Sequence, residues 1–363
     1  MKIGVVGLPN VGKSTLFNAI TEAGAECANY PFCTIEPNVG VVAVPDARLD
    51  VLEKMYSAKR VVPAVIEFVD IAGLVKGASH GEGLGNKFLS HIREVDAIIE
   101  VVRCFDDANI INVSDTVDPV RDADIINTEL MLADLESIEK RRARFEKTVK
   151  SGDPKAVEAL AVLNKMTECI ESGKSLRSLK LDRETLALVD GQFLLSVKPI
   201  IYCANISEND IGCSDNAYVS AVRAFAAQEG AAVVEICAKV EQEISSLPKD
   251  ERGEYLDALG LEKSGLERII TSGYELLGLM SYLTAGEKEV RAWTIERGTT
   301  APKAAGKIHT DFERGFIRAE IVSYDDLVAL GSVGAAKAAG KLRSEGKDYV
   351  MKDGDVVEFR FNV

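Results

Sequence analysis

The clearest chemistry in this chain lies between Gly7 and Thr15, where the sequence reads Gly-Leu-Pro-Asn-Val-Gly-Lys-Ser-Thr. This run fits G-x-x-x-x-G-K-[ST], the phosphate-binding P-loop. Glycines let backbone N–H groups approach phosphate oxygens closely. A lysine at this spacing reaches the β- and γ-phosphates, and the hydroxyl after it ligates Mg²⁺. We predict Lys13 as a catalytic residue, Ser14 as a Mg²⁺ ligand, and these nucleotide contacts: Asn10, Val11, Gly12, Lys13, Ser14 and Thr15.

A P-loop needs a strand before it and a helix after it. Residues 2–6 are short, apolar and β-branched, as in a buried strand. From Ser14 onward the apolar residues Leu16, Phe17 and Ile20 follow helical spacing. The alternative, a glycine-rich turn ahead of an ordinary helix, is disfavoured because the full motif and its context occur together.

Two later positions are candidates for the Mg²⁺ site. The segment 29–38 contains two prolines and is expected to be a loop, in which the hydroxyl of Thr34 could join the metal as in nucleotide switches. A structural proline loop is the alternative. The apolar run 61–70 predicts a strand that ends at Asp70, where a carboxylate suits the metal's outer shell, as a Walker-B aspartate does.

The residues after Asp70 are expected to face the γ-phosphate. The N–H of Gly73 could contact it, but Leu74 stands where many GTPases have the glutamine that orients water. The following loop, 77–86, is rich in glycine and contains His80. His80 is a candidate catalytic residue that positions water, or else a solvated loop residue.

Base selection is expected at Asn205-Ile206-Ser207-Glu208, which follows the strand-like run 198–204. GTPases carry N-K-x-D here, and its aspartate accepts two hydrogen bonds from guanine. Ile206 and the longer Glu208 weaken that clamp, because a misplaced partner loses selectivity. Asn205 could pair with the N6/N7 edge of adenine and the Ile206 backbone with the base. A last strand and loop at 232–239 could cover the base.

Strands alternating with helices predict an α/β, doubly wound, mostly parallel sheet for residues 1–120 and 190–275. Between them, at 121–189, two amphipathic helical runs flank a Gly-Asp-Pro turn and predict an inserted antiparallel helical hairpin, a short coiled coil. Its tip has a basic bias that either is a solvated face or contacts RNA. The residues concerned are Lys140, Arg141, Arg142, Arg144, Lys147 and Lys150.

Residues 276–363 alternate apolar and polar side chains and predict a small β-rich domain. Positive charge gathers here, and it is either a solvated rim or a docking surface for RNA or the ribosome. The residues concerned are Lys303, Lys307, His309, Arg314, Arg318, Lys337, Lys341, Arg343 and Lys347.

Composition narrows the class of protein further. The chain has 363 residues, 47% hydrophobic and 28% charged, which is typical of a soluble protein of two or three domains. A net charge of −14 argues against a chain that coats nucleic acid over its whole surface. The 7 cysteines form no C-x-x-C pair, no apolar run matches a membrane span, and no signal peptide is evident. We expect a reduced, cytoplasmic protein without a membrane partner.

These motifs together resemble the Obg-like ATPase (YchF) family of translation-factor-related P-loop proteins. The resemblance rests on the P-loop and on three further segments: Tyr30–Asn38, Asp70–Leu74 and Asn205–Glu208. The C-terminal part, including 301–309, resembles a TGS domain. The resemblance implies ATP hydrolysis without a catalytic glutamine, ribosome association through the large subunit, Mg²⁺ on Ser14 and Thr34, and adenine on Asn205 and Ile206.

The sequence therefore favours a slow, Mg²⁺-dependent nucleotide hydrolase that prefers ATP to GTP and acts as a ribosome-associated switch. One alternative is a GTPase of the translation-factor type, in which Glu208 reaches guanine despite its length. Another is a nucleotide-gated RNA-binding adaptor whose hydrolysis is incidental, with RNA held by the hairpin and the TGS-like domain.

Overall fold

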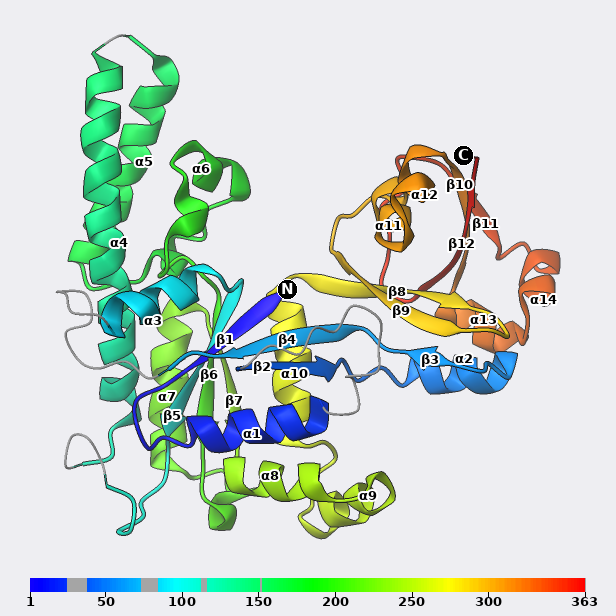
Figure 1. Cartoon of the computed structure of the whole chain (residues 1–363), viewed down its shortest axis with the longest axis horizontal. Helices are drawn as coiled ribbons and strands as arrows, with labels where there is room; N and C mark the ends of the chain where they lie inside the picture. Colours follow the sequence, from blue (N-terminus) through cyan, green and yellow to red (C-terminus); the bar gives the residue numbers. More distant parts are fainter. Residues whose placement is uncertain (25–37, 73–83, 112–115, 151, 363) are drawn as a thin grey trace. The chain divides into compact units, whose positions relative to one another are not determined.

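The computed structural model describes the chain apart from residues 25–37, 73–83, 112–115, 151 and 363 (Figure 1). The described residues form two compact units. One holds 1–24, 38–41 and 67–272, with the gaps just given, and the other holds 42–66 and 273–362. The segment 42–66 thus groups with the C-terminal residues, whereas the sequence placed it in the nucleotide-binding domain.

The first unit is built on a six-stranded sheet of order β2-β4-β1-β5-β6-β7. Each neighbouring pair from β4 through β7 is parallel. The central strands β1, β5 and β6 are almost entirely buried, as expected of a parallel sheet covered on both faces. This confirms the predicted α/β class. The strands are β1 (Lys2–Val6), β2 (Val39–Ala43), β4 (Val65–Asp70), β5 (Ala97–Arg103), β6 (Ile200–Asn205) and β7 (Ala232–Ile236).

The first unit also contains helices, and the last residues of α10 group with the second unit. They are α1 (Lys13–Gly24), α3 (Leu84–Arg93), α4 (Pro119–Val149), α5 (Pro154–Glu171), α6 (Arg183–Leu188), α7 (Ala217–Glu229), α8 (Ala238–Ser246), α9 (Lys249–Ala258) and α10 (Gly265–Leu276). Short 3-10 turns are η3 (Leu176–Leu179), η4 (Gly191–Phe193) and η5 (Glu208–Asp210).

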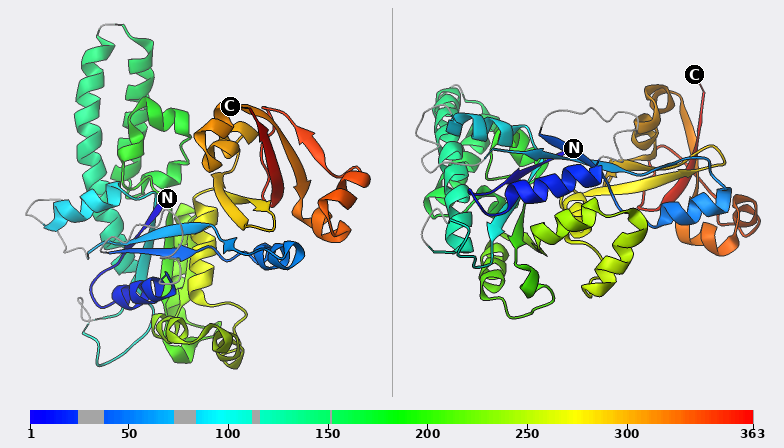
Figure 2. Two further views of the ribbon diagram at one scale, coloured as in Figure 1. Left: turned by 45° about the vertical axis from the view of Figure 1, so that its right-hand side comes forward. Right: turned by 60° about the horizontal axis from the view of Figure 1, so that its bottom comes forward.

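The long helices α4 and α5 run side by side as a hairpin (Figure 1, Figure 2). Each begins at an aspartate whose side chain accepts a backbone N–H, Asp118 from Arg121 and Asp153 from Lys155, with a proline as the next residue. This is a favourable way to start a helix, because the cap satisfies an orphan donor and proline has none to lose. Apolar side chains from both helices, such as Ile138 and Leu163, share one buried cluster.

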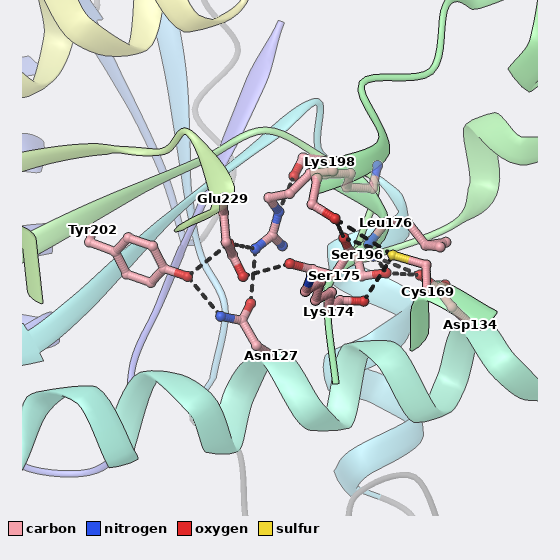
Figure 3. A network of polar contacts seen from close by, with 12 residues as sticks. Asn127, Asp134, Cys169, Lys174, Ser175, Leu176, Ser196, Lys198, Tyr202 and Glu229 are labelled. Atoms are coloured by element: carbon pink, nitrogen blue, oxygen red, sulfur yellow. Dashed lines mark hydrogen bonds and ion pairs between the residues drawn. The ribbon is translucent and has the colours of Figure 1, made fainter. Parts of the chain in front are cut away.

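A buried polar network ties the hairpin to the sheet (Figure 3). Asn127 of α4 donates to the hydroxyl of Tyr202 on β6 at 2.7 Å. Arg177 of η3 donates to Asn127 at 3.0 Å and to Glu229, at the end of α7, at 2.7 Å. Glu229 also accepts from Tyr202 and Ser175. Four elements are thus held by charge-assisted bonds, which are stronger than neutral ones.

The second unit carries its own six-stranded sheet, of order β11-β10-β12-β8-β9-β3. The run 61–70, expected as one strand, is two: β3 joins this sheet beside β9, and β4 joins the first sheet. Pro63 stands between them, and a proline cannot donate to a strand ladder. The strands are β3 (Val61–Val62), β8 (Leu279–Ala285), β9 (Val290–Glu296), β10 (Phe316–Ser323), β11 (Arg343–Glu345) and β12 (Asp355–Phe361).

The core of this unit includes Tyr282, Phe316 and Phe359, which contact one another edge to face in pairs through Phe359. Its helices are α2 (Arg48–Tyr56), α11 (Ala301–Ile308), α12 (Thr310–Arg314), α13 (Tyr324–Leu330) and α14 (Val333–Ala338). Among all the described residues of the chain, no helix combines the length and the hydropathy that a membrane crossing needs.

Candidate functional site

The P-loop lies between β1 and α1, as the motif predicts. Gly12 has a φ of +97°, a conformation that suits glycine, and Asn10 has a φ of +65°. A Cβ added to Gly7 would lie 2.8 Å from the carbonyl oxygen of Val101, on the neighbouring strand β5. The two glycines are therefore required by local geometry as well as by the approach of phosphate.

A cavity of about 870 Å³ opens over the P-loop. Of the predicted residues in the described part of the chain, it is lined by Asn10, Gly12, Lys13, Ser14, Thr15, Asn205, Ile206 and Glu208. Segments nearly two hundred residues apart therefore meet at one hollow. It lies at the carboxyl ends of parallel strands, where ligands bind in doubly wound sheets. Val11, also predicted as a nucleotide contact, is buried and does not line the cavity. Its carbonyl oxygen accepts a hydrogen bond from the side chain of Asn205.

Lys13 and Asp70 form an ion pair within the described residues, with the ammonium group donating to Oδ1 of the carboxylate. Both side chains are largely buried, at 12% and 24% exposed. The carboxylate reaches the pair from the end of β4, and the lysine from the first turn of α1. The structure thus brings the predicted catalytic lysine and the predicted metal-site carboxylate together.

Asn205 holds two parts of the pocket together. Its Nδ2 donates to the carbonyl oxygen of Val11 at 2.8 Å, and its Oδ1 accepts from the N–H of Ala238 at 3.0 Å. The side chain is 4% exposed. Its oxygen and one N–H therefore serve the scaffold, which leaves one N–H of the amide for a base.

Two side chains of opposite charge line the cavity at the Asn205–Glu208 turn. Glu208 accepts from the ammonium group of Lys239 at 3.2 Å, and both side chains are exposed. Ile206 is buried, and its N–H donates to the carbonyl of Ile236 at 2.7 Å. The backbone N–H of Ile206 is thus engaged, so the backbone contact with a base that the sequence predicts would have to come from the Ile206 carbonyl.

Sequence reasoning missed one wall of the cavity, formed by Phe105, Asp106, Asp107 and Ile110. These residues follow β5 directly, so the rule that ligands bind beyond the carboxyl ends of parallel strands could have found them. The expected loop after β7 does reach the cavity, through Cys237, Ala238 and Lys239. Thr34, Gly73 and His80, which were predicted from the motifs, lie outside the described residues.

The donors in the pocket suit a hard divalent cation. The hydroxyl of Ser14 is exposed at the cavity, and the carboxylate of Asp70 lies against Lys13, one of the residues that line the cavity. Mg²⁺ prefers oxygen ligands and is commonly held by one or two protein groups together with substrate phosphates. The described residues hold no cluster of three or more histidine, cysteine or acidic side chains, and such a cluster is not needed for this type of site.

A parallel doubly wound sheet, a P-loop at the start of α1, and a cavity lined by the P-loop lysine, which pairs with Asp70, define a P-loop nucleotide-binding protein. Comparison with protein families agrees. A family model described as "50S ribosome-binding GTPase" matches residues 2–134. A second, "YchF-GTPase_C", described as a protein of unknown function, matches residues 279–362.

Full-length relatives narrow the class to one family. The chain is 57% identical to "Ribosome-binding ATPase YchF" of Bacillus subtilis, covering 99% of both chains. It is 56% identical to the protein of the same name from Escherichia coli O157:H7, covering 100% of this chain and 99% of that one. A solved structure, "Structure of the Schizosaccharomyces pombe YchF GTPase", matches with a TM-score of 0.89 at 42% identity, covering 99% of this chain and 97% of that one. The chain belongs to the YchF family.

Proposed function

We propose that this protein is a Mg²⁺-dependent nucleotide hydrolase that prefers ATP to GTP and acts in the cytoplasm as a ribosome-associated switch. One observation carries the proposal: the P-loop, with Lys13 paired to Asp70, and the turn from Asn205 to Glu208 line a single cavity. The relatives are named ribosome-binding ATPases, which supports the same activity here.

Catalysis in such a site is mainly positioning and charge stabilisation. Lys13 would leave Asp70 to bind the β- and γ-phosphates, and backbone N–H groups at the start of α1 would bind oxygens of the same groups. Ser14 and Thr34 would hold Mg²⁺, with Asp70 in its outer shell, and bound Mg²⁺ would neutralise phosphate charge. Leu74 cannot orient water, so turnover would be slow unless His80 or a partner does so.

Preference for ATP follows from the charges at the base end. The carboxylate of Glu208 is engaged by Lys239, so it is a poor acceptor for the two N–H groups of guanine. Ile206 replaces the lysine of the GTPase turn with an apolar side chain. The remaining N–H of Asn205 would then donate to N7 of adenine.

We propose that the protein binds the large subunit of the ribosome. The hairpin of 121–189 and the TGS-like domain of 276–363 would contact RNA. The family model that matches residues 2–134 is described as a 50S ribosome-binding GTPase, which supports the choice of the large subunit. At the hairpin tip, Lys140, Arg142 and Arg144 are paired with Glu136, Glu146 and Asp190. Within the described residues, Lys147 and Lys150 have no such pair.

Phosphate release with ATP, with and without EDTA, tests the enzymatic part of the proposal. Activity that needs Mg²⁺ and is lost in Lys13→Ala is expected, whereas activity that survives the substitution would contradict it. Cosedimentation with ribosomes, repeated with the double variant Lys147→Ala and Lys150→Ala, tests the docking part. We expect binding to weaken most at low salt, because exposed charges are screened by ions.

A second candidate, a GTPase, is favoured by one observation: Glu208 is exposed and its partner Lys239 is also exposed, so the pair can open. The solved relative is titled a GTPase. Hydrolysis of GTP faster than ATP at equal concentration would support this reading.

A further inference from the structure

Arg103 is a buried arginine at the last position of β5, and among the described residues its guanidinium donates to no carboxylate. It is 3% exposed. Its guanidinium donates to three backbone carbonyl oxygens: Phe105 at 3.0 Å, Ile110 at 3.2 Å and Asp107 at 3.1 Å. The same group lies 4.8 Å from the centre of the Phe105 ring. The segment 104–111 is thus folded around one side chain.

Residues 104–111 form neither a helix nor a strand, so their carbonyl groups need other partners. Side chains provide them. Besides the three bonds from Arg103, Asn216 donates to the carbonyl of Cys104 at 3.1 Å, and Asn10 donates to that of Ile111 at 3.0 Å. A lysine could not replace the arginine, because one ammonium group cannot reach three carbonyls that the planar fork spans.

The segment forms a wall of the nucleotide cavity, through Phe105, Asp106, Asp107 and Ile110. In the sheet, Arg103 is in register with Asn205, and the N–H of Cys104 donates to the carbonyl of Asn205 at 2.8 Å. Phe105, two residues after Arg103, therefore lies close to the start of the Asn205–Glu208 turn, and both line the cavity. Phe105 and the buried Ile206 give this end of the cavity two apolar side chains that suit a purine ring.

We propose that Arg103 is a positioning residue for the base: it fixes the Phe105 wall, and the bond from Asn10 links that wall to the P-loop. The inference rests on the proposed nucleotide site. It assigns to Arg103 an effect on base binding that acts through the 104–111 segment, without contact between the guanidinium and the nucleotide.

The test compares ATP with inorganic tripolyphosphate, which has the phosphates but no base. Arg103→Lys keeps the charge and loses the fork. We expect its affinity for ATP to fall about tenfold, as for loss of a charge-assisted hydrogen bond, with tripolyphosphate affinity unchanged. KM for ATP should rise by a similar factor, with kcat within about twofold of wild type.

Arg177→Lys is the matched control, because Arg177 is also buried and donates to a carbonyl, of Lys198, and to side chains away from the cavity. We expect it to lower the thermal midpoint without changing ATP affinity. If Arg103→Lys also lowers only the midpoint, its role is structural and the proposal is overturned. Equal losses for ATP and tripolyphosphate would overturn it as well.

Asn10→Gly keeps the test informative if Arg103→Lys does not fold. Glycine adopts the positive φ of this position and removes the bond to Ile111. ATP affinity should fall more than tripolyphosphate affinity, and a loss confined to tripolyphosphate would count against the proposal. The proposed function fails separately, if wild type binds neither probe.

Discussion

The side-chain amide of Asn205 lies so close to the α-carbon of Gly12 that no larger residue fits at position 12. A Cβ added to Gly12 would overlap with Nδ2 of Asn205, and its φ of +97° already disfavours a side chain. The same amide donates to Val11 at 2.8 Å. The P-loop and the Asn205–Glu208 turn are therefore in direct contact, and we expect a change in one to affect the other.

Gly12→Ala should abolish nucleotide binding, because the methyl group must displace Asn205 as well as adopt the left-handed conformation. The second effect alone costs about 1–2 kcal/mol. Binding of a fluorescent ATP analogue and thermal unfolding measure the two consequences. Gly298→Ala is a suitable control, since Gly298 has a φ of +89° and no atom of the residues that the structure describes lies within 4 Å of an added Cβ. It should lose stability but keep ATP affinity, and retention of affinity by Gly12→Ala would contradict this account.

Lys13→Met should reduce ATP hydrolysis by about a hundredfold or more, since it removes the charge that stabilises the transferred phosphoryl group. The ion pair with Asp70 also disappears, which leaves the carboxylate without this partner. Steady-state phosphate release at saturating ATP gives the comparison. Lys140→Met serves as control, because Lys140 also pairs with a carboxylate, that of Glu136, but on an exposed helix face. Loss of activity in the control would mean that charge alone, rather than position, explains the effect.

Much of this architecture could be predicted from the sequence. The P-loop and its flanking strand and helix follow from local spacing. Apolar runs predict the strands of the sheet around it. The break between β3 and β4 at Pro63 was missed, although a proline inside a strand pattern is a warning. The place of 42–66 in the second unit depends on pairing with β9, which no local pattern encodes.

The finer structure of the site was less accessible, because it depends on contacts between distant residues. Asn205 was predicted as a base-binding residue, yet most of its hydrogen-bonding groups serve Val11 and Ala238. Arg103 looked like the end of a buried strand, and its three carbonyl partners are visible only in three dimensions. The pairing of Glu208 with Lys239 likewise joins two separate loops.

The buried carboxyl group of Glu100 should make the stability of the protein depend on pH. It is fully buried on β5, and within the described residues neither carboxyl oxygen has a hydrogen-bond partner. Burial raises its pKa well above the ordinary value of 4.5; Arg177 opposes the shift, and Glu229, Asp122 and Asp124 add to it. The group is therefore neutral in the folded state over a range in which it ionises when unfolded.

The stabilising effect of this neutral group is complete below pH 4.5 and is lost as the pH rises towards the folded-state pKa. Glu100→Gln, which cannot ionise, should remove that part of the decline. Urea unfolding from pH 5 to pH 8 tests this: the advantage of the variant should grow with pH. An advantage that stays constant across the range would show that Glu100 does not ionise on unfolding as described.

Exchanging the base turn should change nucleotide preference. The double variant Ile206→Lys and Glu208→Asp restores the N-K-x-D pattern and frees Lys239 from its present partner. We expect the ratio of ATP to GTP affinity to shift towards GTP by about tenfold or more, because two hydrogen bonds to guanine become available. Titration of both nucleotides against wild type and variant measures the ratio. An unchanged ratio would mean that this turn does not select the base.

The central claim is that the cavity between the P-loop and the Asn205–Glu208 turn binds and hydrolyses ATP in preference to GTP. Competition is the most direct test: wild-type protein receives ATP and GTP at equal concentration with Mg²⁺, and the two diphosphate products are quantified. The account predicts that ADP forms in clear excess over GDP, and that both products disappear with Lys13→Met. Equal amounts, or an excess of GDP, would contradict it.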